Sequence, residues 1–382
     1  MMKPKIRFKG FEGEWKAEEL AHVCSVNRGV RVTRNDLHNN GIYPVYQNTD
    51  YPMGYYTKFN VESNNPFVIV GGSAGLIGFC HTNFWAADDC VFFGDNPIIN
   101  KSFLYNNLIF HKTEIKRNVR GASVPRLDRE TLRKLPVSIP SLPEQQEIAS
   151  YFTSLDSQIS ASTSRLASLK QMKAASLQAM FPQEGETVPK IRFKGFEGEW
   201  KKVKFSELYE RSSIKNDLSF GTDKIISVAN MYFIKNSRQV DDDYLRSYNI
   251  MRLGDIAFEG NKSKNFAHGR LVENTIGDGI VSHVFIVMKP ISKNYDLNFW
   301  KYYINNENIM GNILVRSTKS STMMTDLVVD DFLKESILVP SYEEQIEIGK
   351  ILTSLDRQIS LQSQRLEKLK QIKSACLDKM FV

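Results

Sequence analysis

A stretch that occurs twice decides the fold of this 382-residue chain. Residues 140–181 read PSLPEQQEIASYFTSLDSQISASTSRLASLKQMKAASLQAMF, and residues 340–381 read PSYEEQIEIGKILTSLDRQISLQSQRLEKLKQIKSACLDKMF. Aligned without gaps, 23 of the 42 positions are identical. In each copy a serine, Ser141 or Ser341, precedes a glutamate by three residues, which matches a capping box at a helix N-terminus. Each copy is therefore expected to form one long helix.

The apolar residues of each copy recur at alternating spacings of four and three, which indicates a coiled-coil seam. Ser162 and Gln362 each place one polar layer in it. A helix of ~38 residues is ~57 Å long. Because the chain returns between the copies, we expect an antiparallel pair; the alternative is that each helix packs on its own preceding segment. The seam positions expected to form the coiled coil and to dock partners are Phe152, Leu155, Ile159, Leu166, Leu169, Leu352, Leu355, Ile359, Leu366 and Leu369. The polar face, which includes Lys173 and Lys373, is expected to be solvated or to dock a partner.

A second, shorter repeat frames the long one. PKIRFKGFEGEWK occurs at residues 4–16 and again at 189–201, identical at all 13 positions. The chain thus follows one plan twice: short repeat, variable insert, long repeat. Two similar frames around inserts of little sequence similarity indicate one task performed on two targets; a duplication without functional meaning is the alternative. We expect four regions: a first domain (1–139), a central helix and linker (140–188), a second domain (189–339) and a C-terminal helix (340–382).

The two inserts have the texture of strands and turns. Short β-branched and aromatic runs are broken by Gly, Asn, Asp and Pro, and residues 294–309 are typical of a short helix. The sequence therefore predicts an α+β protein, with two α/β domains separated by two long helices in a pseudo-twofold repeat.

Composition limits the function classes. The chain carries 50 Lys+Arg and 43 Asp+Glu, a net charge of +7, which allows a polyanionic partner without requiring one. No apolar run approaches ~18 residues, and the first 16 residues have no apolar core, so neither a membrane span nor a secretory signal is expected. Four scattered cysteines without CxxC spacing are typical of reduced thiols in a cytoplasmic protein.

The motifs of catalysis are missing from the sequence. Gly72, Gly75 and Gly78 lie three apart, which matches neither GxGxxG nor a P-loop. No HExxH, paired-cysteine or GxSxG arrangement occurs. We therefore expect no catalytic residue, no metal and no cofactor in this chain, and chemistry supplied by other chains.

Recognition is the remaining role. Residues 112–134 hold eight basic and three acidic residues around Gly121-Ala122-Ser123. Lys and Arg contact phosphates, and Arg can also form two parallel hydrogen bonds with a guanine base. Tyrosines alternate with amide side chains over residues 43–56, and further basic residues lie in 260–270 and 316–322. Surface solvation of the charges and strand packing of the tyrosines are the alternatives. The candidate DNA-binding residues are Gln47, Tyr51, Tyr55, Ser73, Lys116, Arg117, Arg120, Ser123, Arg126, Lys262, Lys264, Arg270, Arg316 and Lys319.

The combination resembles the specificity (S) subunits of Type I restriction–modification systems over essentially the whole chain. GGSAGLIGF (71–79), GASVPRLDRETLRKLPVSIPSLPEQ (121–145), the KIRFKGFEGEW repeats and the helix openings carry the resemblance. It implies that each insert is a target recognition domain that reads one half of a bipartite site in double-stranded DNA. The helices would set the spacer and dock two methyltransferase (M) subunits, which use AdoMet to methylate adenine N6. Two restriction (R) subunits would add cleavage driven by ATP with Mg.

Two alternatives accompany this interpretation. One is an orphan DNA-binding adaptor that works without a methyltransferase. The other is a self-contained nuclease or methyltransferase, which AdoMet binding by the isolated chain would support. The stretch GASVPRL (121–127) has no equally good copy in the second half, where STKSSTMMTDL (317–327) takes its place.

Overall fold

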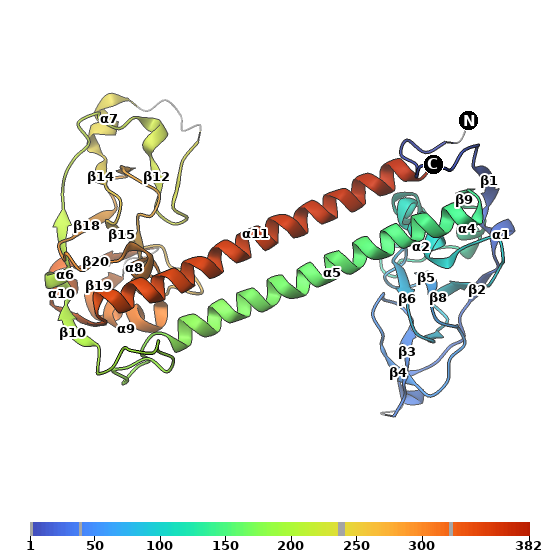
Figure 1. Cartoon of the computed structure of the whole chain (residues 1–382), viewed down its shortest axis with the longest axis horizontal. Coiled ribbons are helices and arrows are strands. Elements are labelled where there is room, and N and C mark those ends of the chain that lie inside the picture. The colour runs from blue at the N-terminus through green and yellow to red at the C-terminus, as the bar shows by residue number, and fades with distance from the viewer. Residues whose placement is uncertain (1–2, 38–39, 236–240, 321–323) are drawn as a thin grey trace. The chain divides into compact units, whose positions relative to one another are not determined.

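The computed structural model describes residues 3–37, 40–235, 241–320 and 324–382. The chain divides into two compact units that do not follow chain order (Figure 1). The first unit combines residues 1–164 with 363–382, and the second comprises residues 165–362. Each long helix therefore contributes one part to each unit, and the C-terminus belongs with the N-terminal domain.

A four-stranded antiparallel sheet forms the centre of the first unit, in the order β2 (Val26–Arg28), β8 (Cys90–Phe93), β5 (Asn65–Ile69) and β6 (Ile77–Cys80). The central strand β5 is buried along its whole length, as expected for the apolar run Pro66–Ile69. A smaller sheet contains β3 (Tyr43–Tyr46), β4 (Gly54–Tyr56) and β7 (Trp85–Ala86). The helices are α1 (Leu20–Val23), α2 (Lys101–Phe110), α3 (Lys112–Arg117) and α4 (Arg129–Arg133), with a 3-10 turn at Arg34–Asp36.

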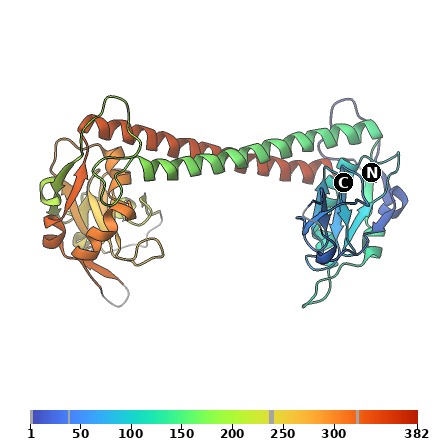
Figure 2. The same cartoon turned by 90° about the horizontal axis from the view of Figure 1, so that it is seen from below.

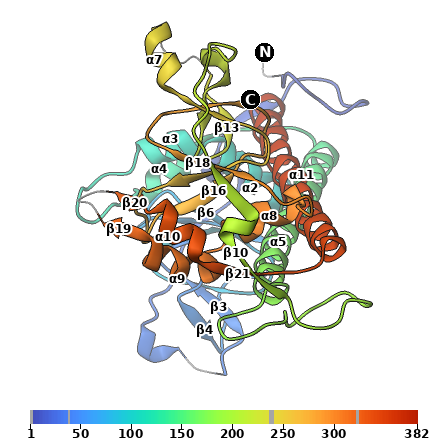
Figure 3. The ribbon, with the colours of Figure 1, turned by 90° about the vertical axis from the view of Figure 1, so that its left-hand side faces the viewer.

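The second unit repeats this order with different residues. Its four-stranded sheet runs β11 (Tyr209–Ser212), β18 (Ile286–Pro290), β15 (Ile256–Glu259) and β16 (Arg270–Glu273), all antiparallel. The expected helix at 294–309 is two helices, because Asp296 and Asn306 each cap a new N-terminus. The remaining elements are α6 (Phe205–Leu208), a 3-10 turn (Thr222–Lys224), β12 (Ile226–Ser227), β13 (Tyr232–Phe233), α7 (Asp242–Ser247), β14 (Asn249–Met251), β17 (Gly279–Val281), α8 (Leu297–Tyr303), α9 (Glu307–Ser317), β19 (Thr318–Ser320), β20 (Thr325–Leu327) and α10 (Val329–Lys334). Figure 3 shows α9 beside α10.

One antiparallel strand pair closes each insert. In the first unit β1 (Lys16–Glu19) pairs with β9 (Pro136–Ile139), and in the second β10 (Lys201–Lys204) pairs with β21 (Ser336–Val339). The strand that leaves the short repeat thus lies against the strand that leads into the long helix. Inserts of different sequence are held at their ends in the same way.

The long repeats form α5 (Leu142–Ala179), of 38 residues, and α11 (Tyr342–Met380), of 39 residues. Within each unit the two helices run antiparallel side by side (Figure 2). In the first unit the ammonium of Lys373 lies 2.5 Å from the carboxylate of Asp156. In the second unit Lys173 lies 2.5 Å from Asp356, which is the same pair with the helices exchanged. The two pairs correct the expectation of a wholly solvated polar face, because these lysines reach across to the neighbouring helix.

Most of the predicted seam is buried, and the polar layer at Ser162 and Gln362 is buried with it. Half-buried positions occur at Ile159, Leu166, Ile359 and Leu369. The buried positions are Phe152, Leu155, Leu169, Leu352, Leu355 and Leu366.

The C-terminal Met-Phe pair of each long repeat is inserted in the core of a domain. Phe381 packs against the rings of Trp15, Phe103 and Phe152 in the first unit. In the second unit Phe181 packs against Phe299 and Tyr303, next to Trp200. The repeated MF at the end of each helix is therefore part of a hydrophobic core.

The short repeat also has a structural role. Arg7 donates two hydrogen bonds of 2.7 Å to the carboxylate of Glu144, in the first turn of α5. Arg192 and Glu344 form the equivalent pair at α11, with bonds of 2.8 and 2.7 Å. Both glutamates are 1% exposed, so the carboxylates depend on these guanidinium groups and on the positive helix end.

This pairing modifies the expected capping box. The backbone N–H of Glu344 donates to Ser341 Oγ at 3.3 Å, as a cap requires. The Glu344 carboxylate turns to Arg192 instead of reaching back to the cap. The next residue completes the anchor: Gln145 bonds to the backbone of Asn100, Ile98 and Pro140, and Gln345 to that of Asp296, Asn294 and Pro340.

Candidate nucleic-acid interface

Three segments of the first unit meet beyond the end of β5. Gly72 donates its backbone N–H to Pro125 at 3.1 Å, and Leu127 donates to Val70 at 2.9 Å. Ser73 donates its backbone N–H to Asn48 at 3.1 Å. Residues 47–48, 71–75 and 120–126 therefore form one surface, here called the first loop cluster.

Glycines allow these loops to approach closely. A Cβ atom at Gly71 would lie 2.4 Å from Asp89 Oδ1. Gly72 has a φ of +76°, and a Cβ atom there would lie 2.9 Å from Asn48 Cβ. Side chains other than hydrogen do not fit there. The GGS of the sequence is thus a close-approach loop rather than a phosphate cradle.

The basic residues in the first loop cluster and in the neighbouring helix α3 differ in how they are held. Lys116, Arg117 and Arg120 are exposed and form no ion pair within the described part of the chain. Lys116 adjoins the loop, since its Cγ lies 3.4 Å from an ideal Cβ at Gly75. Arg126 is oriented by Asp89, whose carboxylate lies 3.1 Å from the guanidinium.

The tip of the loop is a tight hairpin-like turn. Arg120 and Arg126 exchange backbone hydrogen bonds of 2.8 and 2.7 Å, and Gly121 adopts a φ of +91°. This turn presents Ser123 in an exposed position. Free cations and an exposed hydroxyl on one fixed surface suit contact with phosphates and base edges.

The tyrosine-rich segment divides into two groups. Tyr46 packs on Phe67 with ring centroids 4.4 Å apart, so it belongs to the core. Tyr51 and Tyr55 are 66% and 50% exposed. Gln47 is half-exposed and precedes Asn48 of the first loop cluster, whereas Tyr55 lies in β4.

The second unit holds a corresponding surface. Thr325 donates its backbone N–H to Gly260 at 2.8 Å, and Asn261 forms a bridge with Met324. The loop 260–269 after β15 thus meets the β19–β20 hairpin, as the loop after β5 meets residues 120–126. These segments form the second loop cluster, which carries the exposed Lys262, Lys264 and Lys319. The paired strands β19 and β20 therefore take the place in the fold that residues 120–126 take in the first unit, although the sequences differ.

Two arginines proposed from the sequence are engaged inside the second unit. Arg270 donates to Glu259 at 2.6 Å and to the carbonyl of Ala229 at 2.7 Å. Arg316 forks onto Glu335 at 2.9 and 2.7 Å, which raises the pKa of Arg316 and lowers that of Glu335. These hydrogen bonds hold both guanidinium groups against acceptors of the same unit, so we restrict the second loop cluster to the three lysines.

Sites for other chemistry are sparse in the described residues. Among them, no group of three or more His, Cys, Asp or Glu side chains is arranged to hold a metal ion. Burial raises the pKa of the Cys24 thiol to about 12, which keeps it protonated and unreactive. Within the same residues, no helix is long and apolar enough to cross a membrane.

Comparison with known proteins agrees with this architecture. A family model described as Type I restriction modification DNA specificity domain matches residues 12–171 and again residues 197–371. The specificity subunit of the Type I restriction enzyme MjaVIII from Methanocaldococcus jannaschii is 21% identical over 401 residues, which covers 96% of this chain and 91% of that protein. The EcoDI specificity subunit of Escherichia coli is 23% identical over 181 residues, 47% of this chain and 40% of that protein.

A solved structure shows the same fold. The S subunit of a Type I restriction–modification system from M. genitalium matches 100% of this chain and 99% of that chain, with a TM-score of 0.66 and 16% identity. The predicted fold, two α+β domains with two long helices, is confirmed. Because the family model covers most of the sequence in two copies, the chain belongs to the Type I restriction–modification DNA specificity family and is a non-catalytic specificity subunit.

Proposed function

We propose that the two inserts each read one half of a bipartite DNA site. The observation that carries this proposal is the correspondence between the loop clusters. Both lie where a loop after the third strand of a four-stranded sheet meets a hairpin, yet they present different side chains. Contacts to phosphates fix a protein on DNA, and contacts to base edges give sequence preference. One scaffold with two different reading surfaces suits two different half-sites.

The long helices supply the spacing and the assembly surface in this proposal. Met172 and Ile372 occupy equivalent positions in the two repeats and are 55% and 37% exposed, outside the seam. Each lies next to a lysine that pairs across to the other helix. We assign one M subunit to each of these two equivalent helix surfaces.

The proposal also includes the remaining members of a Type I complex. Two R subunits complete it, with AdoMet bound in M and ATP with Mg in R, and the complex acts on DNA in the cytoplasm. The adaptor that works without a methyltransferase is the second candidate.

The proposal is tested by exchanging residues 17–139 for the insert of another specificity subunit. The chimera is co-expressed with the cognate M subunit, and methylated adenines are mapped in the host DNA. We expect one half of the methylated motif to change and the other to stay. A change in both halves, or in neither, contradicts the proposal.

The adaptor alternative is tested by co-purification with the M subunit. M172E and I372E should each remove one M subunit, and K368A, a change at another exposed position of α11, should remove none. A chain that never retains an M subunit favours the adaptor.

A further inference from the structure

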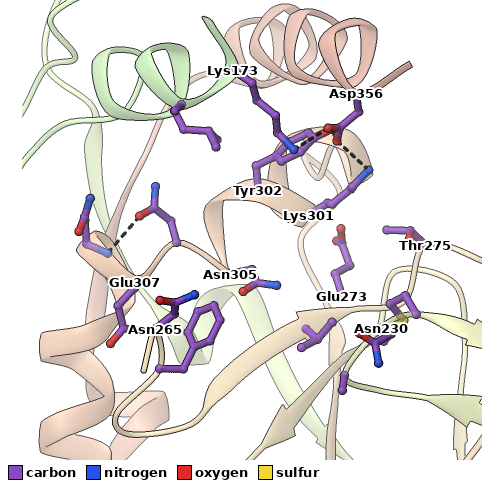
Figure 4. A pocket seen from close by; sticks show the side chains of 18 of the residues that line it. Lys173, Asn230, Asn265, Glu273, Thr275, Lys301, Tyr302, Asn305, Glu307 and Asp356 are labelled. Carbon is purple, nitrogen blue, oxygen red and sulfur yellow. Dashed lines mark hydrogen bonds and ion pairs between the residues drawn. The ribbon is translucent and has the colours of Figure 1, made fainter. Parts of the chain in front are cut away.

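A polar pocket lies in the second unit outside both the seam and the exposed lysines of the second loop cluster. Its volume is about 770 Å³, within the range of small-molecule sites. The walls come from α5, α8, α11, β16 and the loop 260–269 (Figure 4). The last of these brings Asn265 and Phe266 into the wall, directly after Lys264.

A charged cluster lies in one wall of the pocket. Asp356 accepts from Lys173 at 2.5 Å and from the hydroxyl of Tyr302 at 2.6 Å, and Lys301 lies 3.8 Å away. This cluster fixes the domain helix α8 to the helix pair, and its two ammonium groups exceed its one carboxylate by one positive charge.

The pocket also contains polar groups without partners, and Glu273 lies beneath Lys301 (Figure 4). Glu273 is 2% exposed, and its Oε2 has no hydrogen-bond partner among the described residues, while Oε1 accepts from Tyr295. Burial raises the pKa of Glu273 well above its usual range, which favours the protonated carboxyl, the form in which Oε2–H donates. A buried polar atom left unpaired is costly and calls for a ligand or an ordered water.

Amide side chains line the pocket as well. Asn230, Asn265 and Asn305 line the pocket from three separate segments, and their side chains form no hydrogen bond with other described residues. Phe266 adds an aromatic ring, with the guanidinium of Arg270 4.9 Å from its centroid. A buried carboxyl with an unpaired oxygen, free amides and a planar aromatic–guanidinium pair are complementary to a planar ring with donors and acceptors along its edge.

We propose that this pocket binds a nucleobase. The base comes either from a free nucleoside or from DNA that extrudes one base beside the loop 260–269. The second source rests on the proposed function, whereas the first does not. Extrusion carries the cost of unpairing and unstacking one base, which hydrogen bonds in the pocket can offset. The first unit lacks the carboxyl group. Glu273, the last residue of β16, pairs with the first residue of β15. At the equivalent position of the first unit, Cys80, the last residue of β6, pairs with the first residue of β5.

Binding of free bases is measured by titrating adenosine, guanosine, cytidine and thymidine into the full chain. We expect at least one nucleoside to bind, and N305A and E273M to weaken it by about tenfold, the effect of one hydrogen bond. E273Q keeps both a donor and an acceptor and should bind within about threefold of the original chain. N312A, on the outer surface of α9, is the control that should leave binding unchanged.

Binding of an extruded base is measured with 2-aminopurine placed at successive positions of a duplex that the chain binds. A rise in fluorescence at one position, lost in N305A and retained in E273Q, assigns the pocket to DNA. Equal loss in E273Q and E273M contradicts the role of a neutral carboxyl. If no nucleoside binds and no position unstacks while the duplex stays bound, the pocket holds only water and the proposal is wrong. A chain that binds no duplex contradicts the proposed function. In that case the nucleoside titration alone shows whether the pocket binds a nucleobase.

Discussion

Replacement of Lys116, Arg117 and Arg120 by alanine removes the free cations of the first loop cluster. All three side chains are exposed and unpaired within the described residues, whereas Ile115, which directly precedes Lys116, is buried. The triple variant should therefore keep its fold, because the packing side chain of α3 is untouched. Its effect falls on DNA binding.

The size of the effect follows from counterion release. If each cation neutralises one phosphate, the slope of log Kobs against log salt concentration becomes less steep by about 2.7, at ~0.9 per contact. This difference corresponds to roughly 500-fold weaker binding at about 0.1 M salt, and the two affinities converge as the salt approaches about 1 M. Removal of a base contact would instead lower the affinity by a similar factor at every salt concentration.

The assay is fluorescence anisotropy on a duplex that carries the methylated site, measured over about 50 to 300 mM salt. K3A/K5A/K9A is the matched control, because it removes three exposed lysines from the same unit outside the first loop cluster. A slope that stays unchanged in the loop variant, or that changes equally in the control, would place the DNA elsewhere and refute the assignment.

Four further predictions concern stability and spacing. F381A removes a ring from the core of the first unit and should destabilise that unit by about 3–5 kcal/mol, and F181A should destabilise the second unit by a similar amount. Hydrogen exchange measures the two units separately, and an equal effect of F381A on both would contradict the assignment of Phe381 to the first core. R7M leaves the buried Glu144 carboxylate unpaired and should cost about 3–5 kcal/mol in chemical denaturation, with R192M as its counterpart; a loss below about 1 kcal/mol counts against a buried pair. Burial alone would raise the pKa of Asp356, but hydrogen bonds from Lys173 and Tyr302 hold it below the ordinary value of 3.8. The contribution of Asp356 to the free energy of unfolding is therefore present above pH 3.8 and is lost as the pH falls through the lower pKa of the folded state. D356N should make the melting temperature fall less steeply at acid pH, and an unchanged pH dependence would refute this. Lengthening both helices by seven residues should lengthen the spacer of the recognised site, and an unchanged spacer would refute the ruler.

The long helices were predictable because their signal is local. The apolar spacing is written in consecutive residues, and the structure confirms both helices at nearly the expected length. Their antiparallel pairing was also predictable, since the chain must return between the copies. The Lys173–Asp356 and Lys373–Asp156 pairs were not, because a helical wheel does not show which exposed side chains reach a partner.

The anchors of the short repeat could not be predicted from spacing. Arg7 and Glu144 are 137 residues apart, and no local pattern joins them. The available signal was the identity of the two copies of the repeat, which places Arg192 and Glu344 in the same relation. Identical repetition indicates that both copies meet the same surroundings, but it does not reveal what those surroundings are.

The candidate interface was only partly predictable. The basic segment around Gly121 lies beside the GGS loop, as a shared surface requires. This contact depends on the hydrogen bonds Gly72–Pro125 and Leu127–Val70, which join residues far apart in the sequence. The equivalence of β19 and β20 with that segment rests on backbone pairing and not on sequence. Arg270 and Arg316 show the limit of composition, because a basic residue in a polar stretch can equally be held by a glutamate.

The central claim is that one chain directs modification of a two-part DNA site. It is tested most directly by co-expressing the unmodified chain with its cognate M subunit and mapping N6-methyladenine across the host DNA. The account predicts one methylated motif made of two short specified parts separated by a spacer of fixed length. A continuous motif, a spacer of variable length, or a stable complex that methylates no motif would contradict it.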